Sequence, residues 1–376
     1  MGRGYEAAFR KSKVLKAESK RDLCFLKKTF SLAKKAEGFT SPNPLVGALF
    51  VKNSKILSFG YHHKAGGPHA EIEAIRSARK NLRGSTLYIN LEPCCHFGRT
   101  GPCVDQIIKR GIKKVFISSI DPNPKVKGKS IRKLRKAGIK VEVGLYKREA
   151  QELNEVFFKN IREKKPFVVA KVAQSLDGKI ATQKGISQWI TSSSSRKFSK
   201  KLRDKYDCVL IGANTLIKDN PSLEGLKKTP FKAVISPRLN IPLNSYILKK
   251  NPDKLIIFTS DKSKSARKKI PPGVKVFFLK EEKGWLPIKR ILKILYFLGI
   301  MSVFVEGGSQ TLGQFFIKKE VDKVFFFIAP KIIGGKTALS SIGAEGFPTL
   351  DSCPHLKDFR IKRIGRDVLI WGYPQY

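Results

Sequence analysis

Strand-like and helix-like segments alternate along the chain in two successive series, and this alternation limits the possible folds more than any other feature. Such alternation is typical of layered α/β domains. At 376 residues the chain is longer than a single core normally requires, so we expect two α/β domains in tandem. In the first series, the expected strands lie at 45–51, 55–61, 85–91, 113–120 and 139–144, with helices at 22–38, 69–80 and 129–138. In the second, the expected strands lie near 207–211, 231–235, 254–258, 274–278, 302–306 and 322–328, with helices near 194–205, 287–298 and 309–317.

The patterns also suggest where the domains begin and end. Residues 1–21 are basic and lack an apolar core, so we expect a disordered leader. The first domain is expected at 22–146 and the second at 166–376. Between them, "KREAQELNEVFFKNIREKK" (147–165) is amphipathic and stops before Pro166, which predicts one connecting helix.

Composition narrows the class of protein without identifying a partner. The net charge of +45 is divided between both halves rather than gathered in a patch or tail, which favours solvated lysine-rich faces over a specific nucleic-acid site. No segment has the roughly 18 uncharged apolar residues of a membrane helix, so we expect a soluble protein without a membrane partner. Three of the six cysteines crowd one loop, which favours metal binding in a reducing, cytoplasmic compartment over a disulfide framework.

His69 and Glu71 in "PHAEIEAI", together with the loop "LEPCCHFGRTGPC" (91–103), match the pattern H-x-E … P-C … C and resemble zinc-dependent nucleobase deaminases. One imidazole and two thiolates can hold Zn²⁺ tetrahedrally and leave a fourth position for water, whose pKa the metal lowers. Glu71 is then expected to be catalytic, because a nearby carboxylate that is not a ligand can carry protons.

The loop offers more sulfurs than such a site needs. Cys94 and Cys103 each follow a proline, a geometry that suits the start of a helical turn, whereas Cys95 must point elsewhere because successive side chains diverge. We therefore expect His69, Cys94 and Cys103 to bind one zinc ion per chain, and Cys95 to serve packing. His62 and His63 are expected at the surface.

The longer cysteine spacing, with "TSPNPLVGA" before it and "DPNPKVKGKS" after it, resembles the bifunctional riboflavin-biosynthesis deaminase–reductases of the RibD type. The resemblance runs from about residue 22 to the C-terminus. It implies a cytidine-deaminase-like three-layer domain followed by a dihydrofolate-reductase-like domain. It also implies zinc-dependent deamination of 2,5-diamino-6-ribosylamino-4(3H)-pyrimidinone 5′-phosphate, followed by NADPH-dependent reduction of 5-amino-6-(5-phosphoribosylamino)uracil to the ribityl product.

The resemblance assigns further residues by their place in matching motifs. In the first domain it implies pyrimidine contacts from five residues: Asn43, His96, Arg99, Asp121 and Asn123. Asn-Pro and Asp-Pro are also ordinary turn formers, so a turn role for Asn43, Asp121 and Asn123 stays open. In the second domain it implies substrate contacts from Ser187, Arg203, Leu223 and Glu306. It implies NADPH contacts from Ala173, Trp189, Thr215, Asp219, Ser236, Gly308, Ser309, Gln310, Thr311, Leu312, Gly313 and Gln314.

The second half lacks G-x-G-x-x-G, so the dinucleotide fingerprint of the Rossmann type is absent. What remains is "SVFVEGGSQTLGQFF", a strand, a double glycine and a helix, which weakly indicates phosphate binding. The segment "IIGGKT" (332–337) indicates phosphate binding even more weakly. The chain departs from the family pattern in two motifs. Gly101-Pro102 stands where the family usually has Pro-Pro before the last zinc ligand, and "DDPxLTxR" reads "DNPSLEGLKK", so Leu226 stands where an arginine normally meets the substrate. We consider Lys227 or Lys228 as substitutes.

Two other functions compete with this one. A zinc deaminase of nucleosides or tRNA with an inactive second domain would suit the basic charge, but leaves the second α/β series unexplained. A lysine-rich RNA-binding protein with a degenerate deaminase fold conflicts with the intact His69, Glu71, Cys94 and Cys103. We therefore expect small phosphorylated pyrimidines as partners, no specific nucleic acid, and leave a homo-oligomer open.

Overall fold

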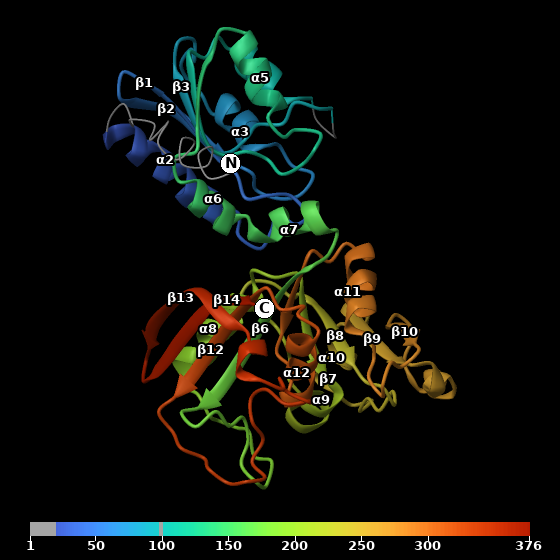
Figure 1. The fold of residues 1–376 in the computed structure, drawn as a ribbon. Helices are drawn as coiled ribbons and strands as arrows, with labels where there is room; N and C mark the ends of the chain where they lie inside the picture. The colour runs from blue at the N-terminus through green and yellow to red at the C-terminus, as the bar shows by residue number, and fades with distance from the viewer. Residues whose placement is uncertain (1–19, 98–100) are drawn as a thin grey trace, which may run out of the picture. The chain divides into compact units, whose positions relative to one another are not determined.

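The computed structural model describes residues 20–97 and 101–376. The chain divides into two compact units, residues 1–163 and 164–376, which Figure 1 colours from blue to green and from green to red. Most of the expected leader lies outside the described residues. Helix α2 (Lys20–Ala33) already includes residues 20 and 21, so the last part of that leader is helical instead.

The first unit is built on a five-stranded sheet in the order β2-β1-β3-β4-β5. β1 runs antiparallel to β2 and β3, whereas β3, β4 and β5 are parallel. The strands are β1 (Gly47–Lys52), β2 (Lys55–Tyr61), β3 (Thr86–Leu91), β4 (Lys114–Ser119) and β5 (Lys140–Val143). The remaining helices are α3 (Ala70–Arg76), α4 (Cys103–Lys109), α5 (Lys129–Lys136), α6 (Lys147–Leu153) and α7 (Glu155–Glu163).

Helices cover both faces of this sheet, because alternate strand residues point to opposite sides. Leu49 and Val51 pack on one face with residues of α2 and α6. Ala48 and Phe50 pack on the other face with residues of α3, α4 and α5. Figure 1 shows α2 and α6 along one side of the sheet and α3 and α5 along the other. The three-layer architecture expected from the sequence is confirmed.

The segment expected as one helix at 147–165 is instead two helices, α6 and α7, separated at Asn154. The side chain of Asn154 is buried; its Oδ1 accepts a hydrogen bond from Leu45 N (2.7 Å) and its Nδ2 donates to Leu45 O (3.0 Å). An asparagine that bonds to backbone groups elsewhere interrupts a helix readily. The break therefore ties this segment to the loop that carries Asn43.

The second unit contains a nine-stranded sheet in the order β10-β9-β8-β7-β11-β6-β12-β14-β13. Its strands are β6 (Phe167–Ser175), β7 (Cys208–Gly212), β8 (Phe231–Ile235), β9 (Leu255–Ser260), β10 (Lys275–Leu279), β11 (Ser302–Val305), β12 (Lys323–Ala329), β13 (His355–Ile364) and β14 (Asp367–Gln375). Its helices are α8 (Ser193–Arg203), α9 (Ala213–Asp219), α10 (Tyr246–Lys250), α11 (Ile288–Phe297) and α12 (Ser309–Ile317). Short 3₁₀ segments cover Lys34–Ala36 in the first unit and Pro252–Lys254, Asp261–Lys269 and Leu350–Ser352 in the second.

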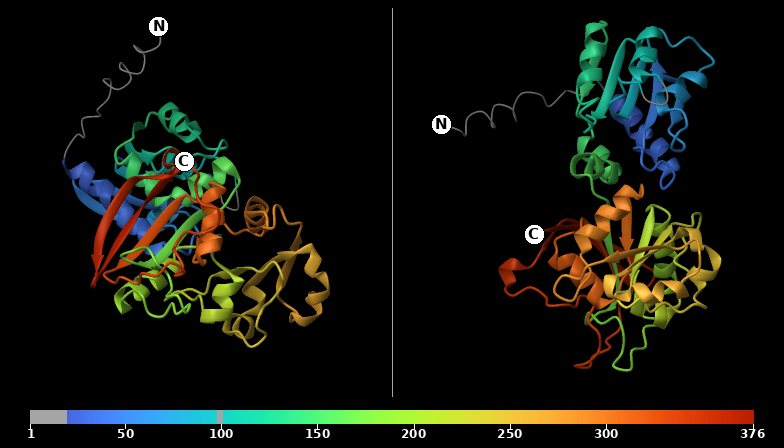
Figure 2. Two further views of the ribbon diagram at one scale, coloured as in Figure 1. Left: turned by 60° about the horizontal axis from the view of Figure 1, so that its bottom comes forward. Right: turned by 90° about the vertical axis from the view of Figure 1, so that its right-hand side faces the viewer.

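Neighbouring strands from β10 to β12 are parallel, and β14 and β13 extend the sheet as an antiparallel hairpin. Figure 2 gives two further views, with this red hairpin at one end of the sheet and the yellow β9 and β10 at the other. The main core lies between the sheet and the apolar faces of α11 and α12. The order reverses between β7 and β11: β8 to β10 continue on one side of β7, and β11 and β6 lie on the other.

Candidate active sites

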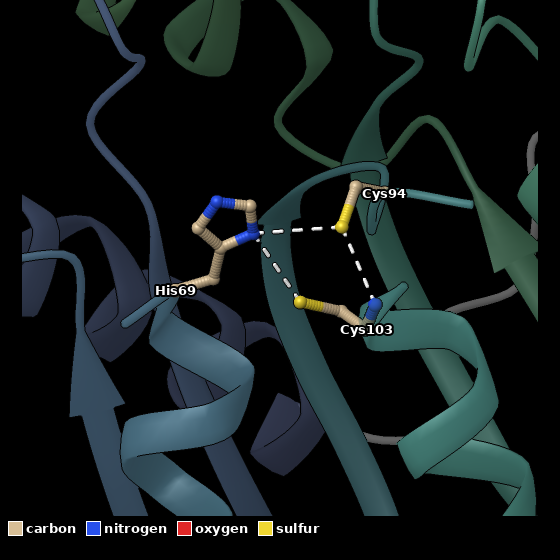
Figure 3. A group of neighbouring side chains, drawn as sticks. All are labelled: His69, Cys94 and Cys103. Carbon is tan, nitrogen blue, oxygen red and sulfur yellow. Dashed lines mark hydrogen bonds between the residues drawn. The ribbon is translucent and has the colours of Figure 1, made fainter. Parts of the chain in front are cut away.

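Three side chains from separate segments of the first unit converge, as Figure 3 shows. His69 directly precedes α3, Cys94 lies in the loop after β3, and Cys103 is the first residue of α4. His69 Nδ1 lies 3.5 Å from Cys94 Sγ and 3.3 Å from Cys103 Sγ, and the three ligand atoms all lie within 4.8 Å of one another. Tetrahedral zinc places nitrogen and sulfur ligands about 3.5 Å apart. The donor set therefore fits a zinc ion.

The backbone around these residues fixes their positions. Cys103 N donates a hydrogen bond to Cys94 Sγ (3.3 Å), and Val104 N donates to Cys94 O (3.1 Å), so the end of the cysteine loop closes on its beginning. Hydrogen bonds from Cys103 and His69 lower the pKa of the Cys94 thiol. A thiolate is the form of cysteine that binds metal.

Glu71 stands beside this cluster in the first turn of α3. Its side chain is only 3% exposed. Burial raises the pKa of Glu71 to about 7, with a further contribution from the charge of Cys94. A carboxyl group that gains and loses a proton near neutrality is suited to carrying protons between water and a substrate.

Cys95, adjacent to Cys94, faces away from the cluster. Its Sγ donates to Lys125 O at 3.6 Å, and the residue packs against the core formed by α3, α4 and α5. Cys94 therefore lies in the cluster and Cys95 packs against the core, as the sequence predicts.

His62 is buried, at 2% exposure, so the expectation that it lies at the surface was wrong. Its Nε2 is 3.1 Å from Asn43 Nδ2, its Nδ1 is 2.9 Å from Pro68 O, and its ring stands nearly perpendicular to that of His69 at 5.6 Å between centroids. His62 therefore connects Asn43 to the segment that carries His69. The burial of His62 could have been predicted from the alternation of β2. Ser58, Gly60 and His62 are two residues apart and continue the same buried face of the strand.

Asp121 and Asn123 form the turn after β4, and their side chains stabilise it. Asn123 N donates to Asp121 Oδ1 (2.7 Å), and Lys125 N donates to Asn123 Oδ1 (3.0 Å). Asp121 is nonetheless close to the cluster: burial raises its pKa to about 7, and the charges of Glu92 and Cys94 add to the shift. His96 is half-buried, and its Nδ1 has no hydrogen-bond partner among the described residues. Arg99 lies outside the described residues.

The second unit has a cavity of about 1110 Å³. It lies at the carboxyl ends of β7, β8 and β11, where the strand order reverses, which is the usual ligand site of open parallel sheets. It exceeds the space that one small ligand normally occupies. Its lining includes all the residues expected to contact substrate, namely Ser187, Arg203, Leu223 and Glu306. It also includes most of those expected to contact NADPH: Ala173, Trp189, Thr215, Asp219, Gly308, Ser309, Gln310, Thr311, Leu312 and Gln314.

Ser236 and Gly313 are the two expected cofactor contacts that do not line the cavity. Ser236 is 1% exposed, and its neighbours Ile235 and Pro237 reach the cavity instead. Gly313 packs against another backbone segment, because a Cβ there would lie 2.2 Å from Gly343 O. This close approach of two backbone segments requires a glycine at position 313.

Two glycines near the carboxyl ends of β7 and β11 lie against the side chain of Thr311 in α12. A Cβ at Gly307 would lie 2.7 Å from Thr311 Cβ, and a Cβ at Gly212, the last residue of β7, would lie 2.6 Å from Thr311 Oγ1. These two glycines therefore make room for the side chain of Thr311. The second glycine motif differs: Ile333 N and Gly334 N already donate to the carboxylate of Asp177 (3.0 and 2.7 Å), so these amides hold a loop in place.

A charged triad lies on the cavity wall. Arg203 binds Glu306 through Nε and Nη2, the latter at 3.0 Å, and Lys171 Nζ lies 3.3 Å from Glu306 Oε2. Burial alone would raise the pKa of Glu306, but the charges of Arg203 and Lys171 outweigh it and lower the pKa to about 2. The remaining nitrogen of Arg203, Nη1, donates to Glu224 O (3.0 Å). Trp189 is 61% exposed rather than part of the core, and Arg196 stacks over its ring at 4.3 Å.

Leu226 lines the cavity, whereas Lys227 and Lys228 do not. The backbone nitrogens of both lysines donate to Asp204 Oδ1 (2.9 and 3.0 Å), and Lys228 Nζ lies 3.6 Å from Asp207 Oδ1. Neither lysine occupies the place that an arginine at 226 would fill.

Comparisons with known proteins cover both units. Residues 19–119 match the cytidine and deoxycytidylate deaminase zinc-binding region, and residues 166–370 match the RibD C-terminal domain. The riboflavin biosynthesis protein RibD of Aquifex aeolicus is 44% identical over 93% of this chain and 98% of its own length. The Escherichia coli protein of the same name is 33% identical over 93% and 98%.

Solved structures agree over both units. A Thermotoga maritima diaminohydroxyphosphoribosylaminopyrimidine deaminase/5-amino-6-(5-phosphoribosylamino)uracil reductase matches with a TM-score of 0.85 and 36% identity, covering 94% of this chain and 99% of the other. Acinetobacter baumannii RibD matches with a TM-score of 0.84 and 31% identity, covering 95% and 99%. No described helix is long and apolar enough to cross a membrane.

Matches that span both domains support a deaminase–reductase over a nucleoside or tRNA deaminase with an inactive second domain. The zinc-binding family model and the convergent His69, Cys94 and Cys103 agree on the chemistry of the first domain. The chain belongs to the RibD family of bifunctional deaminase–reductases of riboflavin biosynthesis.

Proposed function

We propose that the first domain hydrolytically deaminates 2,5-diamino-6-ribosylamino-4(3H)-pyrimidinone 5′-phosphate with one zinc ion per chain. We propose that the second domain reduces 5-amino-6-(5-phosphoribosylamino)uracil to the ribityl product with NADPH. The observation that carries the first assignment is the cluster of His69, Cys94 and Cys103 with the buried carboxyl of Glu71 beside it. A cavity at the reversal of strand order in a RibD C-terminal domain supports the second.

His69, Cys94 and Cys103 would hold the zinc ion. When bound, zinc supplies Lewis acidity that makes water a nucleophile near neutral pH. Glu71 would take a proton from the attacking water, whose oxygen bonds to the ring carbon that carries the amine. It would deliver the two water protons in turn to the ring nitrogen and to the departing amine, so that the C–N bond breaks, ammonia leaves and a carbonyl remains. The elevated pKa of Glu71 suits both steps, because the group must hold the proton briefly and release it.

Asn43 is proposed to contact the pyrimidine ring, together with His96, Arg99, Asp121 and Asn123. The Asn43 amide is oriented by His62. The buried Asp121 has a raised pKa and can donate a hydrogen bond when it is protonated. A fixed amide and a carboxyl of this kind suit the donor and acceptor edges of a diaminopyrimidinone.

In the second domain, NADPH supplies the hydride, and the protein aligns the two ligands. We propose that the cavity residues Gly308, Ser309, Gln310, Thr311, Leu312 and Gln314, with Ala173, Trp189, Thr215 and Asp219, surround the cofactor. Ser187, Arg203, Leu223 and Glu306 would surround the substrate's sugar and phosphate. The Ser187 hydroxyl donates to Asp219 at 2.9 Å, which joins the two proposed groups.

The enzyme is proposed to act in the cytoplasm on small phosphorylated pyrimidines. The test is incubation of the full chain with the diaminopyrimidinone substrate, with and without NADPH, followed by mass analysis. Deaminated product alone without NADPH, and ribityl product with it, are expected. No change of the substrate in either mixture would reject the proposal. Retention of RNA at physiological salt in a gel-shift assay would favour the RNA-binding alternative, because charge-only binding weakens steeply as salt rises.

A further inference from the structure

The cations that line the cavity of the second domain differ in what they already bind. Lys171 and Arg203 both contact Glu306, and Arg196 stacks on Trp189. Lys197, Lys200 and Lys218 also line the cavity, and among the described residues none of the three forms an ion pair or a hydrogen bond. Of these three, Lys200 is the one that lies one helical turn from Arg203. Lys200 is therefore a cation whose charge is available to a ligand.

Helix α8 places Lys200 next to Arg203. Residues three apart on a helix lie on the same side, one turn from each other, so Lys200 and Arg203 reach the same part of the cavity. The loop that carries Leu226 is held against this end of the helix, since Arg203 Nη1 donates to Glu224 O and Asp204 accepts the backbone nitrogens of Lys227 and Lys228. Lys200 thus lies one helical turn from Arg203, and the loop beside Arg203 gives the cavity wall an apolar surface at Leu226.

A second polar group in the same turn lacks a partner. Ser199 is 4% exposed and lines the cavity, and its Oγ has no hydrogen-bond partner among the described residues. Buried hydroxyls are nearly always paired, so an unpaired one at a cavity wall indicates a ligand atom that completes it. Ser199 and Lys200 are successive residues, yet both line the cavity, because Arg196, Ser199, Lys200 and Arg203 follow the i, i+3, i+4, i+7 spacing of one helix face. An anion against this face can therefore meet the hydroxyl and the ammonium from its two sides.

We propose that Lys200 and Ser199 of α8 bind the phosphate group of the reductase substrate. Leu226 supplies no charge for that phosphate, and the guanidinium of Arg203 is largely occupied by Glu306 and Glu224. This inference rests on the proposed reduction of a phosphoribosylamino compound. In this chain the phosphate would therefore be bound by helix α8, and not by a residue at position 226.

The test compares Lys200→Gln with Lys201→Gln in the full-length protein. Lys201 is the next residue of the same helix, is exposed, and does not line the cavity, so it matches the change in charge. Lys200→Gln should raise the KM for 5-amino-6-(5-phosphoribosylamino)uracil by about ten- to a hundredfold, the usual effect of losing a charged hydrogen bond. Its kcat and its KM for NADPH should stay near the wild-type values.

Two further measurements separate a phosphate contact from a general defect. With substrate from which the phosphate has been removed, wild type and Lys200→Gln should have the same KM. Adding Leu226→Arg to Lys200→Gln should restore much of the affinity for the phosphorylated substrate. Ser199→Ala should weaken that affinity less than Lys200→Gln does, and thermal unfolding should confirm that each variant is folded.

The outcomes distinguish this inference from the proposed function. If wild type reduces the substrate but Lys200→Gln behaves like Lys201→Gln, the phosphate contact is wrong and the reductase assignment stands. An equal loss with the phosphate-free substrate, or a raised KM for NADPH alone, would also overturn it. If wild type reduces neither substrate, the proposed reduction fails and this inference with it.

Discussion

The two proposed sites are built in different ways. In the first domain, His69, Cys94 and Cys103 converge within 4.8 Å, and Glu71 stands next to them in the same helix start as His69. In the second domain, the candidate residues are spread around a cavity of about 1110 Å³ and come from β6, α8, α9, α12 and several loops. A metal site needs a few specific atoms at fixed distances, whereas a dinucleotide and a sugar phosphate need a long surface. Single substitutions should therefore abolish the first activity and only weaken the second.

The largest expected effect is the loss of zinc from the first domain. Cys94→Ser and Cys103→Ser should each lose most of the bound zinc and all measurable deamination, because each removes one of three protein ligands. Cys95→Ser is the matched control and should keep about one zinc per chain, since its Sγ faces Lys125 O. Zinc content by atomic absorption checks this. An equal loss in all three variants would contradict the ligand assignment.

Glu71→Gln should separate metal binding from proton transfer. The variant is expected to keep its zinc and to lose deamination by a factor of at least about 10²–10⁴, the usual contribution of a general acid–base group. NADPH-dependent reduction of the deaminated substrate should be unaffected. Ammonia release at a near-normal rate from zinc-loaded Glu71→Gln would remove the carboxyl from the mechanism.

In the second domain, Glu306→Ala should weaken reduction without affecting deamination. The change leaves Arg203 and Lys171 as neighbouring, largely buried cations, and breaking a buried pair of this kind typically costs about 3–5 kcal/mol of stability. We expect a lower unfolding temperature together with a raised KM for the reductase substrate. Glu281→Ala, which removes an exposed ion pair with Lys262, is the control and should change neither. Normal reduction kinetics in a folded Glu306→Ala protein would exclude a substrate contact.

The two sites also differed in how far the sequence could predict them. The cluster of His69, Cys94 and Cys103 followed from residue types and prolines within short segments, and the structure brings the three together. His62 was misplaced because its burial depends on the continuation of one face of β2 beyond the end of the strand, which the adjacent His63 obscures. The interruption of the 147–165 helix depends on Asn154 meeting Leu45, a contact between residues far apart in the sequence.

In the second domain, the strands from β7 to β12 and the helices α8, α11 and α12 were confirmed, with bounds within about two residues. Helices α9 and α10 were not predicted. The hairpin of β13 and β14 was not predicted. Most of β13 is exposed, so its charged and apolar residues show no buried face that would mark a strand. The sequence also could not predict that the backbone of Lys227 and Lys228 is held by Asp204 and that Lys228 Nζ pairs with Asp207. Local patterns predict elements well, whereas long-range polar contacts decide which side chains reach a cavity.

The central claim is that one chain carries two chemically independent sites, and removal of zinc from the full-length protein tests it most directly. After treatment with a chelator and gel filtration, we expect deamination to be lost and to return when Zn²⁺ is added back. Oxidation of NADPH with the deaminated substrate should continue throughout at an unchanged rate, because the proposed ligands His69, Cys94 and Cys103 all lie in the first unit. Parallel loss of both activities, or deamination that persists in zinc-free protein, would contradict this account.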